Sequence, residues 1–144
     1  MLIKDMMTKD VITISPETSL REACRIFKEK RISGIPVVGD EGKIVGIVTI
    51  TDILKMVQEI YQWKELEKSA YGLNLSDLIG KERLNTKVAA VMTKNVYALD
   101  EDKTINDVMR LVFSKKIHTI PIMRDDKLVG IIGKRDLAYF IFEN

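Results

Sequence analysis

The chain has 144 residues, of which 46% are hydrophobic and 31% are charged, values typical of one compact globular unit. Its 23 basic and 21 acidic side chains leave a formal net charge of +2, which argues against non-specific binding to nucleic acid. The single cysteine, Cys24, excludes an internal disulfide, and no apolar stretch approaches the roughly 18 residues of a membrane span. We therefore expect a soluble, cytoplasmic protein.

Two parts of the chain repeat each other. Residues Met7–Val38 align with Met92–Met123 at an offset of 85, with 9 identities in 32 positions. After a turn that is one residue shorter in the second copy, Lys43–Leu54 aligns with Lys127–Ala138 at an offset of 84, with 5 identities in 12 positions. Units of this size bury too little surface to fold alone, so we expect the copies to pack together and leave two equivalent clefts.

Each copy begins with a short β-branched run that predicts a strand, at Val11–Ile14 and Val96–Leu99. A capping-box pattern then predicts a helix start, with Ser19 and Glu22 in the first copy and Thr104 and Asp107 in the second. Apolar residues follow at the i, i+3, i+4, i+7 spacing of a helix buried on one side: Leu20, Ala23, Cys24 and Phe27, and then Ile105, Val108, Met109 and Val112.

Two further apolar runs in each copy predict a strand pair joined by a polar turn. They are Ile35–Val38 with Ile44–Thr49, and Ile120–Met123 with Leu128–Ile132. A second helix is predicted to begin at Thr51–Asp52 and at Arg135–Asp136. The predicted order is β-α-β-β-α, twice, in a mixed α/β (α+β) fold.

The first copy is predicted to run into a long connection. A helix is expected to continue from Ile53 to about Lys68, and a short helix capped by Ser76–Asp77 to follow it to about Leu84. We therefore divide the chain into repeat 1 (residues 1–56), a helical inter-repeat segment (57–87) and repeat 2 (88–144).

The ordered motifs V-M-T, I-S-G-I-P-V-V and G-I-V-T-I-T-D resemble those of a cystathionine-β-synthase (CBS) domain, and the tandem copies resemble a CBS pair, or Bateman module. The resemblance implies two units related by a pseudo-twofold axis. It also implies clefts for an adenosine-containing ligand (AMP, ADP, ATP or S-adenosylmethionine) and a homodimer formed through helices. A module of this family without a fused effector domain would signal to a separate effector protein, which the sequence does not name.

Asp52 and Asp136 each follow the last strand of a copy and have two compatible interpretations. Each carboxylate can stabilise the positive end of a helix dipole, and each can accept both hydrogens of a ribose cis-diol. Thr49 and Thr51 alternate along the strand end beside Asp52, and Thr51 is also a candidate N-cap. In the second copy Arg135 replaces Thr51, either as a phosphate ligand beside Lys134 or as a solvated surface charge.

By resemblance, each cleft combines the acid of one copy with base-facing residues of the other. The cleft of Asp136 would contain Thr18, Ala23, Ile32, Ser33, Ile131 and Arg135. The cleft of Asp52 would contain Ile47, Thr49, Thr51, Lys103, Val108, Ile117 and His118. Here Lys103 takes the place of Thr18, and His118 either borders phosphate or is a structural group.

The sequence has no catalytic triad, CxxC, HExxH or Walker motif, so we expect neither an enzyme nor a bound cofactor or metal. The favoured function is a regulatory module that senses an adenosine-containing molecule and signals by conformational change. The main alternative is an oligomerisation scaffold with vestigial clefts. Nucleic-acid binding is a weaker alternative, because the charge is nearly balanced.

Overall fold

The computed structural model describes residues 2–66 and 83–143 of the chain, and the predicted short helix at Ser76–Asp77 lies outside these residues. The first half contains a hairpin of β1 (Gly34–Val38) and β2 (Ile44–Thr49) with helices α1 (Leu20–Lys30) and α2 (Ile50–Leu66). The second half contains a sheet in the order β3-β4-β5 with two helices. Its elements are β3 (Leu99–Asp100), α4 (Ile105–Lys115), β4 (Thr119–Arg124), β5 (Lys127–Gly133) and α5 (Lys134–Glu143).

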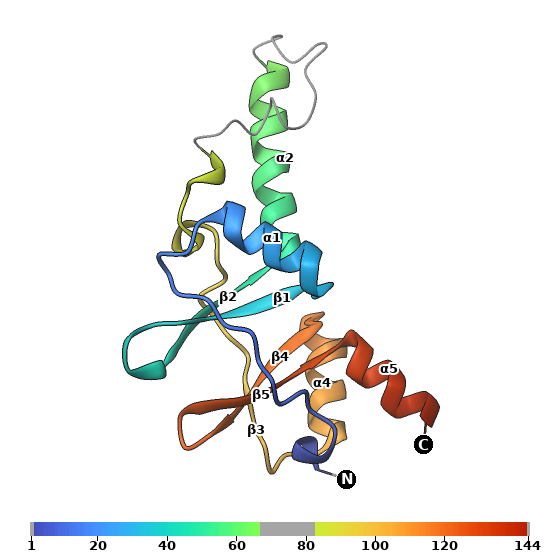
Figure 1. Cartoon of the computed structure of the whole chain (residues 1–144). Helices are drawn as coiled ribbons and strands as arrows, with labels where there is room; N and C mark the ends of the chain where they lie inside the picture. Colours follow the sequence, from blue (N-terminus) through green and yellow to red (C-terminus); the bar gives the residue numbers. More distant parts are fainter. Residues whose placement is uncertain (1, 67–82, 144) are drawn as a thin grey trace.

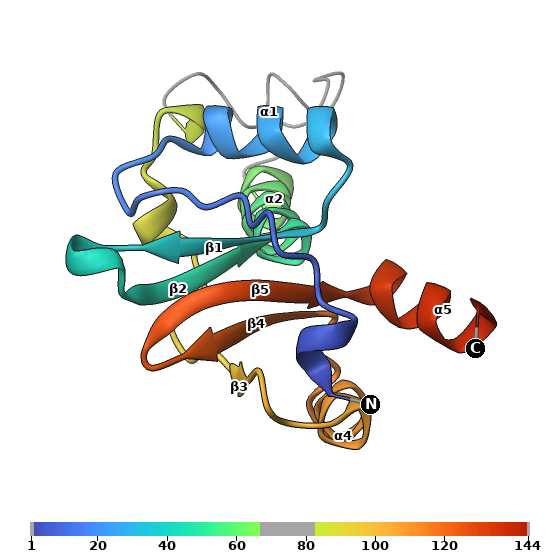
Figure 2. The ribbon, with the colours of Figure 1, turned by 60° about the horizontal axis from the view of Figure 1, so that its bottom comes forward.

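The two sheets lie next to each other at the centre of the molecule, and the helices lie toward the outside (Figures 1 and 2). Helix α1 covers the first hairpin, α4 lies on the opposite side of the molecule, and α5 projects from the end of β5 (Figure 2). Both predicted hairpins are confirmed as antiparallel pairs, with Pro36 opposite Ile47 and Pro121 opposite Ile131. The fold is therefore mixed α+β, with the two halves in a pseudo-twofold arrangement.

The predicted opening strands are much shorter in the structure than in the sequence pattern. In the first copy only Ile14 pairs with the sheet, as an isolated parallel bridge to Val37. In the second copy only Leu99 and Asp100 form a strand, β3, beside β4. The residues before these bridges are unavailable for pairing, because they carry the chain from one half of the molecule to the other.

Helix starts follow the capping chemistry, with one correction. Ser19 Oγ accepts the Glu22 N–H at 3.2 Å, so α1 begins at Leu20 as predicted. The predicted N-cap role of Thr51 is wrong, because Thr49 caps α2. Its hydroxyl accepts the Asp52 N–H at 3.1 Å, and its own N–H donates to Asp52 Oδ2 at 2.9 Å.

Each half contains its own apolar core, and each core takes in the leading segment of the other repeat. Ile3 is fully buried among residues of the second half, and Val88 is fully buried among residues of the first. The backbone fixes both insertions, since Ile3 N–H donates to the Lys103 carbonyl at 2.9 Å and Val88 N–H donates to the Thr18 carbonyl at 2.8 Å. The halves are thus joined by reciprocal exchange of short segments.

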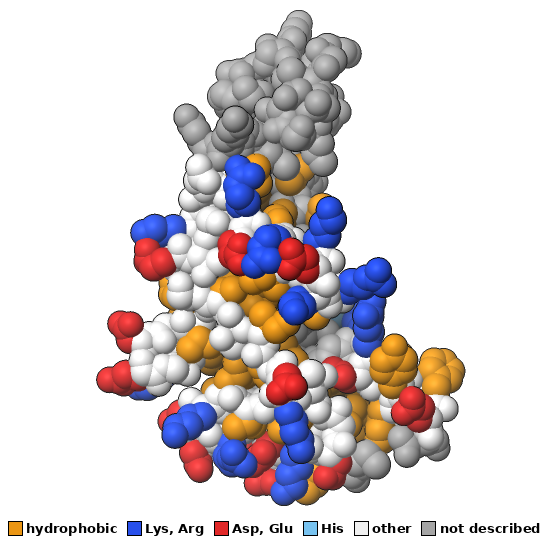
Figure 3. All heavy atoms as spheres, viewed as in Figure 1, with side chains coloured by type: hydrophobic (Ala, Val, Ile, Leu, Met, Phe, Trp, Pro, Cys, Tyr) orange, Lys and Arg blue, Asp and Glu red, His pale blue; other side chains and the backbone are white. Residues whose placement is uncertain are grey.

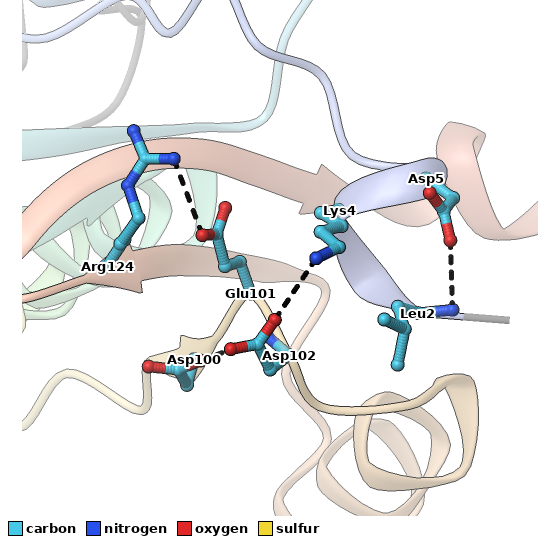
Figure 4. Close-up of polar contacts among 7 residues, drawn as sticks. All are labelled: Leu2, Lys4, Asp5, Asp100, Glu101, Asp102 and Arg124. Atoms are coloured by element: carbon cyan, nitrogen blue, oxygen red, sulfur yellow. Dashed lines mark hydrogen bonds and ion pairs between the residues drawn. The ribbon is translucent and has the colours of Figure 1, made fainter.

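Polar contacts surround the inserted N-terminal segment (Figure 4). Lys4 Nζ lies 3.3 Å from Asp102 Oδ1, and nearby Arg124 Nη1 lies 3.5 Å from Glu101 Oε1. Lys4, Glu101 and Arg124 border a hollow of about 400 Å³. The Lys4–Asp102 ion pair is exposed and contributes little, so the burial of Ile3 is the main attachment of this segment.

Candidate ligand-binding cleft between the repeats

The two candidate ribose acids occupy equivalent positions, three residues after the end of a strand. Asp136 Oδ2 accepts the Gly133 N–H at 2.8 Å, which starts α5 in the way that the Thr49–Asp52 box starts α2. Both acids therefore stabilise the start of a helix, which is the first of their two interpretations. The helix cap uses Oδ2 of each aspartate, so Oδ1 remains available for another partner.

That second oxygen is bonded to a threonine of the other repeat. Thr8 Oγ1 donates to Asp136 Oδ1 at 2.9 Å, and Thr93 Oγ1 donates to Asp52 Oδ1 at 2.9 Å. The backbones of the threonines pair with the strands that precede the acids, Thr8 with Ile131 and Thr93 with Ile47, through hydrogen bonds of 2.8 to 2.9 Å. Each acid thus links the two repeats.

These threonines are functional candidates that the sequence analysis did not single out. A signal was present, since Met-Thr is identical in both copies, at Met7-Thr8 and Met92-Thr93. The methionines of these pairs, Met7 and Met92, each pack against a glycine of the other repeat. A Cβ on Gly46 would lie 2.6 Å from Met92 Sδ, and a Cβ on Gly130 would clash with Met7 Sδ. The glycine in each repeat's second hairpin strand therefore gives the partner methionine room to approach.

The two carboxylates differ in how much acceptor capacity remains. A carboxylate offers about four acceptor positions. Within the described residues, Asp52 receives three hydrogen bonds, from Thr49 N, Thr49 Oγ1 and Thr93 Oγ1. Asp136 receives two, because Gly133 stands in place of Thr49 and has no hydroxyl. Asp136 therefore retains more capacity to accept a pair of ligand hydroxyls.

A cavity of about 670 Å³ opens beside Asp136, within the usual volume range of small-molecule sites. Five of its lining residues are ones predicted for this cleft: Ile32, Ser33, Ile131, Arg135 and Asp136. Both repeats contribute walls, since Ile32 and Ser33 follow α1 and Asp136 lies in α5. Other lining residues were not predicted, among them Thr8, Lys30, Arg31 and Tyr139.

Two residues predicted for this cleft do not line the cavity. Ala23 is fully buried in the core of the first half, on the side of α1 that faces the sheet. Thr18 lies in the turn before α1, where its Oγ1 accepts the Ser15 N–H at 3.1 Å and its carbonyl accepts the Val88 N–H. Ala23 therefore serves core packing, and Thr18 serves the attachment between the repeats.

Two residues predicted for the cleft of Asp52 likewise have structural roles. Val108, the counterpart of Ala23, is fully buried in the second core, and Lys103, the counterpart of Thr18, holds Ile3 through its carbonyl. Of the remaining predicted residues, Ile47 and Thr49 lie beside Asp52 and Thr93. Thr51 and His118 are exposed, and Ile117 is half-buried against the second core.

No chemistry beyond binding stands out in the described residues. Burial raises the pKa of the Cys24 thiol, which disfavours the reactive thiolate. Among residues 2–66 and 83–143, no cluster of three or more His, Cys, Asp or Glu side chains could hold a metal ion. In the same residues no helix is long and apolar enough to cross a membrane.

Comparison with known proteins identifies the family. The model of the CBS domain matches residues 3–59 and again residues 88–143, and the duplicated sequences Met7–Leu54 and Met92–Ala138 lie inside these ranges. The chain belongs to the CBS domain family. Protein MJ1426 of Methanocaldococcus jannaschii is similar to this CBS domain pair, with 34% identity covering 95% of this chain and 89% of the relative.

Solved structures and longer relatives agree with this assignment. The structure of the CBS domain pair of protein MJ0100, in complex with 5′-methylthioadenosine and S-adenosyl-L-methionine, is 26% identical. It covers 98% of this chain and 99% of its own chain, with a TM-score of 0.75. An inosine-5′-monophosphate dehydrogenase of M. jannaschii is 32% identical over 92% of this chain, which spans only 22% of that enzyme. A CBS pair is thus a part of some longer proteins.

Proposed function

We propose that this CBS domain pair is a regulatory module that binds an adenosine-containing ligand in the cavity beside Asp136. The observation that carries the proposal is the composition of that cavity, which both repeats line and in which Asp136 keeps free acceptor capacity. A ribose cis-diol supplies two donors to such a carboxylate. The complex of the MJ0100 pair with two adenosyl compounds supports the same ligand class.

Binding at this position provides a route to conformational change. Asp136 is bonded to Thr8, whose segment continues to Ile3 in the core of the second half. A ligand that bonds Asp136 and also contacts Ile32 of the first repeat favours one relative arrangement of the halves. Such a shift requires that the ligand bind one arrangement more tightly than the other. We propose that the resulting change in the arrangement of the halves is the signal.

The output is proposed to pass through exposed apolar side chains on the helices. Leu54 of α2, Phe113 of α4 and Phe142 of α5 are 60%, 74% and 87% exposed. On α5, Tyr139 and Ile141 near Phe142 are also exposed, and contiguous apolar patches are typical of association surfaces. We propose that the module acts in the cytoplasm as a homodimer formed through its helices, and that it signals to a separate effector protein.

Thermal unfolding with a ligand panel tests the proposal. The full chain is melted alone and with AMP, ADP, ATP or S-adenosylmethionine at millimolar concentration. A ligand present at 100 times its dissociation constant stabilises by about 2.7 kcal/mol, enough to raise the melting temperature by several degrees. We expect the Asp136→Ala variant to lose most of this rise.

Asp52→Ala is the matched control, because it removes the equivalent helix cap and the equivalent bond to a threonine. Both variants are expected to be less stable without ligand by about 1 kcal/mol. Only Asp136→Ala should also lose the ligand effect. If no adenosyl compound shifts the wild-type melt, the sensor proposal fails and a scaffold with vestigial clefts is the better description.

A further inference from the structure

We infer that the cavity beside Asp136 is built for a nucleoside polyphosphate, in preference to a nucleoside or a sulfonium compound. This inference rests on the proposed function and specifies its ligand class. It depends on four basic residues of the cavity lining, Lys30, Arg31, Lys134 and Arg135.

The four basic residues come from two helix ends that meet across the boundary between the repeats. Lys30 and Arg31 lie at the end of α1, and Lys134 and Arg135 begin α5 (Figure 1). In Figure 3, basic side chains are spread over the visible face, and some of them lie where Figure 1 places these two helix ends. The cavity lining contains two acids, Asp10 and Asp136, so its formal charge is positive by two.

None of the four basic side chains has an ion-pair partner among the residues that the structure describes. Elsewhere on the molecule, Arg25 is paired with Glu22 and Glu29, and Arg124 is paired with Glu101. Unpaired cations around a concave site raise the local concentration of anions and favour their binding. Arginine adds a planar fork that bonds two phosphate oxygens at once.

The backbone at Arg31 bears on how the role of its side chain can be tested. Arg31 follows α1 in the left-handed conformation, with φ of 54° and ψ of 42°. This conformation costs a residue with a Cβ about 1 kcal/mol, and glycine is the usual residue at this position. Lys116 ends α4 in the same conformation, so the strain is common to both helix ends. The position of Arg31 in the cavity lining is what makes its side chain a candidate phosphate ligand.

The equivalent positions around Asp52 carry different charges. Lys115 and Lys116 correspond to Lys30 and Arg31, but Ile50 and Thr51 replace Lys134 and Arg135. Lys115 Nζ also lies 5.5 Å from the centre of the Tyr97 ring. Only the Asp136 side therefore has basic residues at both helix ends. The chain itself assigns the polyphosphate to one side of the pseudo-twofold axis.

The positive lining separates the members of the expected ligand class by charge. ATP and ADP would place their additional negative charge among the four basic side chains. Adenosine has no phosphate and gains nothing from them, and the sulfonium of S-adenosylmethionine is repelled by them. We expect ATP to bind at least about tenfold more tightly than adenosine, the factor that one charge-assisted hydrogen bond provides.

Isothermal titration calorimetry on the full chain tests this, with ATP, ADP, AMP, adenosine and S-adenosylmethionine as probes. The decisive variant is Arg31→Gly, which removes a cation and also relieves the left-handed strain. We expect its ATP affinity to fall about tenfold, its adenosine affinity to stay unchanged, and its melting temperature without ligand to be no lower than that of the wild type.

Lys116→Gly is the matched control, because Lys116 ends α4 in the same left-handed conformation, with φ of 56° and ψ of 37°. It should leave ATP affinity unchanged. Equal affinities for ATP and adenosine, with no effect of Arg31→Gly, would overturn the inference and leave the proposed function intact. Loss of ATP binding only in Lys116→Gly would place the polyphosphate on the other side and also overturn it. Failure of every adenosine compound to bind would overturn both proposals.

Discussion

At the scale of single residues, three aspartates share one position in their helices. Asp52, Asp107 and Asp136 are each the third residue of a helix and each accept a backbone N–H from the residue before the helix. Asp52 and Asp136 have a second bond to a threonine of the other repeat, whereas Asp107 is bonded within its own cap. The same local motif thus serves as a simple cap in α4 and as an inter-repeat link in α2 and α5.

The simple cap gives a prediction about pH. The Thr104 N–H bonded to the Asp107 carboxylate holds the pKa of that carboxylate below its ordinary value, helped by the Thr104 hydroxyl and by nearby Lys103 and Arg110. A lowered pKa in the folded state stabilises the fold above about pH 4 and loses this effect as the pH falls further. We expect Asp107→Asn to be less stable than the wild type at pH 7, with the difference shrinking below about pH 4.

Urea unfolding at pH 7 and at several acidic pH values measures this difference. Asp126→Asn is the matched control, because it removes the same charge from the exposed turn between β4 and β5. A stability difference for Asp107→Asn that stays constant from pH 7 down to pH 3 would contradict the explanation.

At the scale of elements, the hairpins serve as platforms for the segments that cross between repeats. The Met92-Thr93 segment lies along β2, and the Met7-Thr8 segment lies along β5. Gly46 and Gly130 make these approaches possible because they have no side chain. Packing therefore explains why glycine is identical at this position in the two copies.

We expect Gly46→Ala to destabilise the fold by about 1–3 kcal/mol, because a methyl group here overpacks the interface. Its Cβ would lie 2.6 Å from Met92 Sδ and 3.0 Å from the Thr93 carbonyl oxygen, and the second atom belongs to the backbone. Gly133→Ala is the control in the equivalent hairpin, since its nearest new neighbour is the His118 carbonyl oxygen at 3.8 Å. Denaturant midpoints measure both, and equal effects would refute the packing argument.

At the scale of the whole molecule, the two halves cannot be separated without opening both cores. Ile3 and Val88 are fully buried in the half opposite to their own repeat. The helices, in contrast, retain large apolar side chains at the surface, including Phe113 on α4 and Phe142 on α5. Since Ile3 and Val88 are fully buried while these aromatic residues stay exposed, we expect the molecule to associate through its helices.

We therefore expect the purified chain to be a dimer, and the double variant Phe113→Ser with Phe142→Ser to be a monomer at micromolar concentration. Loss of two aromatic anchors removes apolar area that an interface would bury. Light scattering coupled to size exclusion measures the mass. Tyr97→Ser removes an exposed aromatic that lies outside the helices and should leave the dimer intact. A monomeric wild type would refute the dimer.

Much of this architecture follows from local patterns in the sequence. The duplication predicts two equivalent halves, the capping motifs locate the starts of α1 and α4, and the apolar runs locate both hairpins. These features depend on neighbours within a few residues, and such patterns are readable in one sequence. The positions of Asp52 and Asp136 at the ends of the predicted hairpins likewise mark them as candidates.

Only the tertiary structure decided which residues share the cavity and which join the halves. Ala23 and Thr18 were assigned to the cleft but belong to the core and to the crossing contact, whereas Arg31 and Thr8 line the cavity without having been predicted. Val11–Ile14 has a strand pattern, yet most of it is a crossing segment. The physical reason is the same in each case. The exchange of segments between the repeats depends on contacts between residues far apart in the sequence, and local periodicity does not predict such contacts.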